Sequence, residues 1–342
     1  MRMHVTRTRW QVACVGLLAL MVSGPAQAVD GVIEINQAKV KVGGVTPGDA
    51  PLFPAIISQP GSYRLTGNLD VTDASARPAG TAAENTTAIL VTADYVTIDL
   101  NGFMIKGPTV CSGSGSSLTC SPTGSGNGIN ATVAGVAVMN GTVQGMGNVG
   151  VYLFDFNKPS QVEKVRALNN GSHGIQANTV ANCTANRNGA WGIYTAEGVT
   201  GCTADSNRNS GIFATSTVAN CTASGNGNYG INATMVTNCT ANFNTGIGIY
   251  AASTATNCTA NSNTVNGIQG STVTNCTAIS NGAKGIEAVT VANCTAQYNS
   301  TGISATTATG CTATGNALVD ISANGIAGHN ICGPGSSTWP CP

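Results

Sequence analysis

Small apolar and polar residues alternate through the second half of the chain with a period of 17 to 19 residues. The triplet Cys-Thr-Ala occurs eight times at this spacing, and its cysteines are Cys183, Cys202, Cys221, Cys239, Cys258, Cys276, Cys294 and Cys311. A fixed period of this length indicates a solenoid, in which each coil buries its apolar side chains by stacking on the next coil.

Each repeat predicts three short strands. The cysteine and the alanine are expected to point inward and the threonine between them outward, because successive side chains of a strand alternate between faces. Isoleucine marks a second inward position nine or ten residues after the cysteine, as in Ile193, and valine marks a third position three residues before the next cysteine, as in Val199. A ninth coil precedes these, with Val165 in the cysteine position.

Stacking of such coils predicts two inward ladders. The cysteines are expected to form a column of free, buried thiols, since the strand spacing of about 4.8 Å keeps their Cβ atoms farther apart than a disulfide allows. An asparagine follows every cysteine by five residues and predicts a hydrogen-bonded ladder, because an unpaired buried amide costs about 1–3 kcal/mol. These asparagines, and the glycine before each isoleucine, are expected at corners with left-handed backbone. The ladder asparagines are Asn188, Asn207, Asn226, Asn244, Asn263, Asn281, Asn299 and Asn316.

The first part of the chain is less regular. A basic and then apolar segment ends in Ala26-Gln27-Ala28, which is typical of a signal peptide cleaved near Ala28. A Gly/Ser-rich stretch over residues 107–126 predicts a loop that projects from the stack. The expected organisation is a signal peptide (1–28), an N-terminal cap (29–60), irregular coils (61–164), regular coils (165–323) and a C-terminal cap or tail (324–342).

Residues 95–103, Tyr-Val-Thr-Ile-Asp-Leu-Asn-Gly-Phe, and the later Asn-x-x-x-Gly-Ile repeats resemble right-handed parallel β-helix proteins of the pectin lyase-like superfamily. The resemblance covers residues 61–325 and is greatest to uncharacterised secreted and periplasmic bacterial members. It implies an all-β fold, a single-stranded right-handed parallel β-helix with three short strands per coil of about 18 residues and an N-terminal cap. It implies no single activity, because the superfamily contains lyases, hydrolases, epimerases and adhesins.

Charge and cysteine usage narrow the class of protein. Charged residues make up 8% of the chain and the formal net charge is zero, so we expect no nucleic-acid partner. Beyond the N-terminal segment, no apolar run has the length of a membrane span. Two close cysteine pairs, Cys111 with Cys120 and Cys332 with Cys341, predict disulfides. The mature protein is expected to be secreted or periplasmic, with an oligomeric state that the sequence leaves open.

One charge-dense region is the candidate ligand groove. The alternative is a loop with solvated charges, in which His173 is an exposed loop residue. No carboxylate pair has the spacing of a glycosidase, so no catalytic residue is assigned, and no second ligand at a suitable spacing supports a metal site or a cofactor. The candidate ligand-binding residues are Asp155, Lys158, Glu163, Arg166, His173, Arg187, Asp205 and Arg208.

The outward threonines of the triplets predict a flat row, which we call the Thr row. It consists of Thr184, Thr203, Thr222, Thr240, Thr259, Thr277, Thr295 and Thr312. We favour a non-catalytic structural or glycan-binding module whose partner is a polysaccharide or a cell-surface glycan. One alternative is a lyase or hydrolase of acidic polysaccharide, built from Asp94, Asp99, Asp155, Glu163 and Arg166. Another is an ice-binding protein that uses the Thr row.

Overall fold

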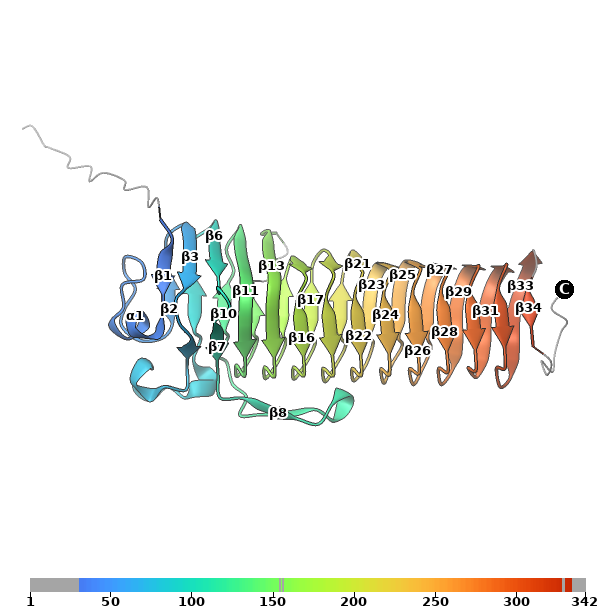
Figure 1. Ribbon diagram of the computed structural model, residues 1–342, viewed down its shortest axis with the longest axis horizontal. Coiled ribbons are helices and arrows are strands. Elements are labelled where there is room, and N and C mark those ends of the chain that lie inside the picture. The colour runs from blue at the N-terminus through green and yellow to red at the C-terminus, as the bar shows by residue number, and fades with distance from the viewer. Residues whose placement is uncertain (1–30, 154, 156, 328–329, 334–342) are drawn as a thin grey trace, which may run out of the picture. The chain divides into compact units, whose positions relative to one another are not determined.

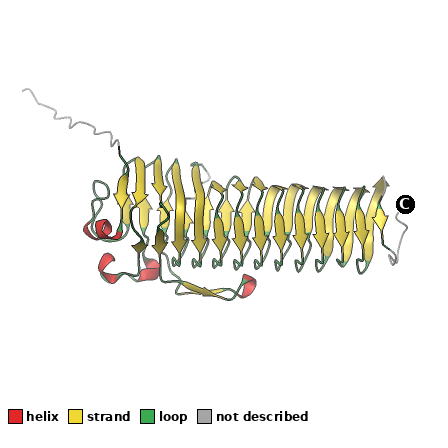
Figure 2. Cartoon of the chain, in the orientation of Figure 1, coloured by secondary structure: helices red, strands yellow, loops and turns green. Residues whose placement is uncertain are grey.

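The computed structural model describes residues 31–153, 155, 157–327 and 330–333, so the predicted signal peptide lies outside the described residues. From Val32 onward the chain is one compact unit built as a stack of coils (Figure 1). The strands of successive coils pair in parallel, which confirms the expected all-β solenoid. Helices occur toward the N-terminal end and at the tip of one hairpin (Figure 2).

Three parallel sheets form the sides of the stack. The Val sheet begins with β1 (Ile33–Ile35), β3 (Gly61–Leu65) and β6 (Val96–Asp99), and the Ile sheet with β2 (Ala55–Ile57), β5 (Ile89–Val91) and β10 (Ile129–Ala131). The Cys–Ala sheet begins with β4 (Leu69–Asp70) and β7 (Met104–Lys106). Two long strands, β11 (Val136–Gln144) and β13 (Ser160–Leu168), belong to both the Val sheet and the Cys–Ala sheet.

The regular coils continue these sheets. The Val sheet adds β15 (Thr179–Ala181), β18 (Val199–Thr200) and β21 (Thr217–Ala219), and the Ile sheet adds β12 (Val151–Tyr152), β14 (Ile175–Ala177), β17 (Ile193–Thr195) and β20 (Ile212–Ala214). The Cys–Ala sheet adds β16 (Thr184–Asn186), β19 (Thr203–Asp205), β22 (Thr222–Ser224), β24 (Thr240–Asn242), β26 (Thr259–Asn261), β28 (Thr277–Ile279), β30 (Thr295–Gln297), β32 (Thr312–Thr314) and β34 (Ile331–Cys332).

The three strands per coil become two from Ile231 onward. One continuous strand then spans the Ile and Val positions, both where five residues separate them, as from Ile231 to Val236, and where six do, as from Ile249 to Ala255. Where the longer spacing returns, after Ile249, the strand absorbs the extra residue as an irregularity between Ala251 and Thr254. The merged strands are β23 (Ile231–Thr237), β25 (Ile249–Thr256), β27 (Ile268–Thr274), β29 (Lys284–Ala292), β31 (Thr301–Thr309) and β33 (Val319–Ala327).

Paired strands extend beyond the expected coil boundaries at both ends. Within the predicted cap, β1 and β2 already pair with β3 and β5, and the short helix α1 (Gln37–Val42) lies between them in sequence. At the other end, β33 and β34 pair with β31 and β32, past residue 323. The coil pattern was missed at these ends because neither segment contains the Cys-Thr-Ala triplet.

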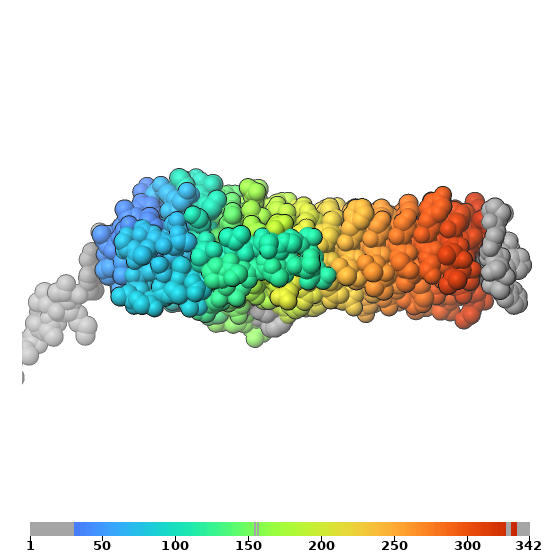
Figure 3. All heavy atoms as spheres, turned by 90° about the horizontal axis from the view of Figure 1, so that it is seen from below, coloured from blue at the N-terminus to red at the C-terminus, as the bar shows by residue number. Residues whose placement is uncertain are grey.

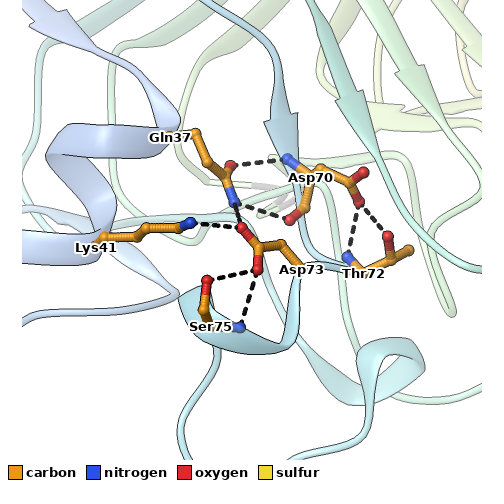
Figure 4. Close-up of polar contacts among 6 residues, drawn as sticks. All are labelled: Gln37, Lys41, Asp70, Thr72, Asp73 and Ser75. Atoms are coloured by element: carbon orange, nitrogen blue, oxygen red, sulfur yellow. Dashed lines mark hydrogen bonds and ion pairs between the residues drawn. The ribbon is translucent and has the colours of Figure 1, made fainter.

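Polar contacts fasten α1 to the next coil (Figure 4). Lys41 forms an ion pair of 2.8 Å with Asp73, and Gln37 donates to the backbone carbonyl of Asp70 at 3.1 Å. Asp73 also caps the 3-10 helix η1 (Ala74–Ala76) by accepting the N–H of Ser75 at 2.9 Å. The hydrogen bond from Lys41 holds the pKa of Asp73 well below its usual range. The helix therefore covers the first coils through a charged network.

The predicted asparagine ladder is confirmed. Each Nδ2 donates to the Oδ1 of the asparagine one coil further on, at 2.9–3.1 Å from Asn170 to Asn316. The second Nδ2 hydrogen of Asn226 goes to the Ala204 carbonyl at 2.9 Å, and its Oδ1 also accepts the Asn207 backbone N–H at 3.0 Å. Asn316 ends the ladder on the Asp320 carboxylate at 2.8 Å.

Left-handed backbone occurs at other positions than the sequence suggested. The ladder asparagines and the glycines before isoleucine do not have positive φ; positive φ occurs one residue before the cysteine, as at Asn220 (54°), and four residues after it, as at Phe243 (58°). The glycine column has a different cause. A Cβ added to Gly211 would lie 2.6 Å from Nδ2 of Asn226 and 2.8 Å from the Gly230 carbonyl oxygen. Glycine is required there by the close approach of the ladder, not by the backbone angle.

The cysteine column is buried and free of disulfides, with each of the eight side chains at most 2% exposed. The backbone N–H of Cys183 donates to Sγ of Cys202 at 3.3 Å, and Cys202 donates likewise to Cys221. The thiol–thiol hydrogen bonds with the preceding cysteine, together with burial, raise the pKa values of Cys202 and Cys221 to about 12. The column ends where Cys311 N–H donates to Oδ1 of Asn330 at 2.8 Å.

The Gly/Ser-rich segment does not project from the stack, contrary to the prediction. It forms an antiparallel hairpin of β8 (Val110–Ser112) and β9 (Thr119–Ser121) with the 3-10 turn η3 (Gly115–Ser117) at its tip. A disulfide joins Cys111 to Cys120, with a Cα–Cα distance of 4.0 Å. The hairpin lies along the coils (Figure 3). The second predicted disulfide, Cys332 with Cys341, stays a prediction because Cys341 lies outside the described residues.

Apolar burial and close backbone approach hold the hairpin down. Leu118 at its tip is fully buried, and the Arg187 guanidinium donates to the Cys111 carbonyl at 2.9 Å. The coils beneath present glycine: an added Cβ would lie 3.4 Å from Cys120 Sγ at Gly189 and 2.5 Å from Ser116 N at Gly227. Both the hairpin and the coils beneath it carry glycine at this contact. The glycine-rich composition that suggested a projecting loop therefore allows the two backbones to pack closely together.

We expect the substitution Asn226→Ala to lower the free energy of unfolding by at least about 2 kcal/mol. It leaves the buried backbone N–H and one of the two Nδ2 hydrogens of Asn207 without acceptors, and each unpaired buried group costs about 1–3 kcal/mol. Equilibrium urea unfolding measures the effect. Asn228→Ala, at an exposed asparagine two residues away, is the control and is expected to change stability by less than about 0.5 kcal/mol. Equal effects of the two changes would contradict a ladder that stabilises the stack.

The eight column cysteines are expected to resist an aromatic disulfide reagent in the native protein at pH 8 and to react fully once the chain is unfolded. Their burial excludes the reagent, and a raised pKa keeps Cys202 and Cys221 protonated at a pH near the ordinary thiol pKa of about 8.5. The absorbance of the released thiolate counts reacted thiols. Labelling of several of these cysteines without unfolding would refute the buried column.

Candidate functional site

The outer face of the Ile sheet carries a cluster of aromatic side chains, which we call the aromatic row: His173, Trp191, Tyr194 and Phe213. Tyr194 and Phe213 follow the inward isoleucines of successive coils and are paired in register, so their side chains point outward one above the other. Trp191 lies three residues before Tyr194, and His173 occupies the position equivalent to Trp191 one coil earlier. All four side chains are half-buried.

Three of these rings are nearly parallel. The centroids of Trp191 and Tyr194 are 4.7 Å apart with an interplanar angle of 8°, and those of Tyr194 and Phe213 are 5.0 Å apart, also at 8°. Trp191 and Phe213 are 5.7 Å apart at 13°. The coil spacing of about 4.8 Å brings aromatic residues on adjacent strands into this range. A second aromatic pair, Tyr229 and Tyr250, has centroids 6.1 Å apart.

The position of His173 differs from the prediction of an exposed loop residue. Its ring lies 5.1 Å from that of Trp191, and its Nδ1 accepts the backbone N–H of Trp191 at 3.2 Å. Burial lowers the pKa of His173 to about 4. The imidazole is therefore neutral at neutral pH, with Nδ1 as the unprotonated nitrogen. The sequence missed this because burial of His173 depends on a tryptophan that only one coil carries.

The charged candidates are distributed over several faces and are not gathered in one groove. Asp155 pairs with Lys158 at 3.6 Å in the turn after β12, and Glu163 pairs with Lys164 at 2.9 Å on β13. Arg166 is in register with Thr184 at the head of the Thr row, and Arg208 is exposed at a coil corner. The charged candidates thus form local ion pairs or stand singly on different sheets, and they do not line one groove.

Two further candidates have structural contacts. Arg187 holds the hairpin through the Cys111 carbonyl and also donates to Asn169 Oδ1 at 3.3 Å. Asp205 lies in the outward row beside the Thr row, where its carboxylate accepts the Ser224 N–H at 2.9 Å. Partial burial raises the pKa of Asp205. Both side chains therefore connect neighbouring segments of the stack.

The Thr row is aligned as expected, with the threonines of successive coils paired in register from Thr184 to Thr312. Within the described part of the chain, none of the eight hydroxyls has a hydrogen-bond partner in the protein. The neighbouring polar row differs, since Asn186 and Asn242 accept backbone N–H groups of the next coil at 2.9 and 3.0 Å. The Thr row is thus a regular hydroxyl surface.

The aromatic row was missed in the sequence because its members do not recur in every coil. Tyr194, Phe213 and Tyr250 all stand eleven residues after a cysteine, and Trp191 and Tyr229 stand eight residues after one. Aligning the coils on these outward positions, in addition to the inward ones, finds the row. Across the residues with described placement, no group of three or more His, Cys, Asp or Glu is arranged to hold a metal ion.

Comparison with known proteins agrees with the fold. The family model for the right handed beta helix region matches residues 84–219. Together with the parallel pairing of the three sheets, this match shows that the fold is a right-handed parallel β-helix. No curated protein matches it in sequence. Over the described residues, no helix is long and apolar enough to cross a bilayer.

Several solved structures are similar to this chain at low identity, with TM-scores below 0.5. The A-module of mannuronan C-5 epimerase AlgE4 from Azotobacter vinelandii is 13% identical, with a TM-score of 0.48, over 87% of this chain and 90% of that one. The periplasmic alginate epimerase AlgG is 11% identical (TM-score 0.38; 82% and 84% covered). The catalytic domain of a GH87 α-1,3-glucanase is 12% identical (TM-score 0.41; 90% and 69% covered). The activities in these names belong to those proteins.

Stability is expected to fall as the pH decreases from about 6.5 to about 4, in part through His173. Its pKa is depressed from 6.5 to about 4 in the folded chain, so unfolding takes up a proton within this window and the neutral ring stabilises the fold only above it. Urea unfolding midpoints of the wild type and His173→Gln, measured across this range, isolate the contribution. The difference between the two proteins should vary with pH only inside the window; a constant difference would contradict a buried neutral imidazole.

Proposed function

We propose that the protein is an exported, non-catalytic β-helix that binds glycans through the aromatic row. The observation that carries the proposal is the half-buried cluster of nearly parallel rings at Trp191, Tyr194 and Phe213. Sugar rings have apolar C–H faces that pack against aromatic side chains, and aromatic residues with a few polar neighbours are typical of binding sites for small polar molecules.

Polar side chains in the same column support glycan binding. Gln176 and Asn232 flank Tyr194 and Phe213 in register, and Gln269 lies beyond Tyr250. Amide groups both donate and accept, as hydroxyl-rich ligands require. The column thus alternates aromatic surface with hydrogen-bonding groups along the direction in which the coils repeat, and a linear chain of sugars is the ligand shape that fits it.

The contacts of the carboxylates support a non-catalytic role. Asp94 accepts the Ala134 N–H at 2.7 Å and Asp155 accepts the Asn157 N–H at 3.0 Å. Asp99 accepts the Asn101 N–H at 2.8 Å and lies 3.5 Å from the Arg64 guanidinium. These groups order turns and neighbouring strands in the irregular coils, where the alternative of a lyase or hydrolase would need them.

Export is supported by the Cys111–Cys120 disulfide, because such bonds persist in oxidising compartments. It agrees with the signal peptide predicted at residues 1–28, which lies outside the described residues. Polysaccharides and cell-surface glycans are accessible to a periplasmic or secreted protein, so export is consistent with a glycan partner for the aromatic row.

The test is binding of a panel of polysaccharides, β-glucan, xylan and mannan as neutral ligands and pectate and alginate as acidic ones, by affinity electrophoresis and calorimetry. We expect Tyr194→Ala to weaken binding at least tenfold, which corresponds to about 1.4 kcal/mol. Tyr298→Ala is the matched control, since Tyr298 is 66% exposed at a coil corner outside the aromatic row. Unfolding midpoints verify that both variants are folded.

Two results would overturn the proposal. The first is equal binding by the wild type and Tyr194→Ala, or a loss that Tyr298→Ala shares. The second is release of reducing ends or of unsaturated products from any polysaccharide of the panel by the wild type, because this would show an enzyme.

A further inference from the structure

The outward column that contains the aromatic row continues to the N-terminal coils. Leu90, Asn130 and Tyr152 are in register on β5, β10 and β12, and Tyr152 pairs in turn with Gln176, next to Tyr194. Since the coils are about 4.8 Å apart, roughly 24 Å of column separates Leu90 from Phe213. The column is therefore a straight path that joins the row to the beginning of the stack.

A pocket of about 310 Å³ lies where this path reaches Leu90 and Asn130. Its walls are Phe53 and Pro54, which lead into β2, and residues from Pro78 to Thr87, which lead into β5. Hydrogen bonds fix the second wall: Arg77 donates to the Thr81 carbonyl at 2.6 Å, and the Glu84 carbonyl accepts the Gly126 N–H at 2.9 Å. The pocket is thus a preformed feature at the end of the path.

The lining indicates the chemistry of an occupant. None of the lining residues is ionisable; proline, leucine and phenylalanine surfaces alternate with threonine hydroxyls and asparagine amides. The side-chain amide of Asn130 has no hydrogen-bond partner among the described residues, although it borders the pocket. A neutral ligand with both apolar and hydroxyl groups, such as one sugar ring, matches this surface, whereas a uronate would lose hydration of its carboxylate without gaining a cation.

We propose that this pocket receives the terminal residue of an uncharged glycan whose preceding residues lie along the column toward the aromatic row. The proposal rests on the proposed function, and it adds that the site recognises a chain end. Phe53 and Pro54 come from the coil on the N-terminal side of Leu90, so they bound the pocket on the side away from the aromatic row, and the sugar that fills the pocket is expected to be the last one of its chain.

The experiment uses the full-length protein and the neutral polysaccharide of the panel that binds best, intact or cut into progressively shorter chains. The protein bound at saturation should rise with the number of chain ends and not with the mass of glycan. Thr81→Trp, which fills the pocket from its outer wall, should weaken binding of the short chains at least tenfold. Thr240→Trp, which adds the same side chain on the Thr row, is the control and should bind like the wild type.

The outcomes separate the two proposals. Binding that follows glycan mass, or short chains that bind Thr81→Trp as well as the wild type while Tyr194→Ala still fails to bind, would overturn end recognition and leave the aromatic row as the glycan site. A Tyr194→Ala variant that binds every ligand like the wild type would overturn the proposed function itself. Unchanged unfolding midpoints are required of each variant before its binding is compared.

Discussion

The structure depends on one repeated interaction, the hydrogen bond between the side-chain amides of asparagines in successive coils. A β-helix leaves the backbone at every corner with groups that the sheets do not pair. The amide of Asn226 accepts from the backbone N–H and the side chain of Asn207 in the preceding coil, and it donates to the Ala204 carbonyl of that coil and to Asn244 in the next one. Because each amide is fully paired only when its neighbours are in place, the ladder fixes the register of the coils, and the sheets follow that register.

A fixed register has consequences for both the inward and the outward side chains of the sheets. Inside, it places cysteine on cysteine, so that sulfur atoms accept backbone N–H groups instead of forming disulfides. Outside, it turns any residue type that recurs at one position into a column. The Thr row has threonine in every coil from Thr184 to Thr312. The aromatic row covers only a few coils, and its N-terminal member is the imidazole of His173, which lies beside Trp191. The outer surface of this fold can therefore change by substitution at outward positions, with no change to the core.

The inward columns could be predicted because strand alternation and a fixed period leave one assignment for Cys183, Ile193 and Val199. The hairpin could not be predicted, since Arg187 and Cys111 are far apart in sequence and composition does not encode their contact. The charged candidates were grouped by closeness in sequence, but residues such as Glu163 and Arg166 lie in different sheets because a coil changes direction between them. The aromatic row requires comparison of coils at positions that vary.

The way in which the ladder ends has a further consequence. Along the ladder, one Nδ2 hydrogen of each asparagine is donated to the next coil in the C-terminal direction, and the acceptor at that end is the carboxylate of Asp320, not another amide. A carboxylate accepts from both the Asn316 side chain and the Gly333 backbone but has no hydrogen to pass on. Asp320 therefore ends the asparagine ladder. Coils inserted before Asp320 would lengthen the stack without changing this end, so duplication of coils alone can change the length of the protein.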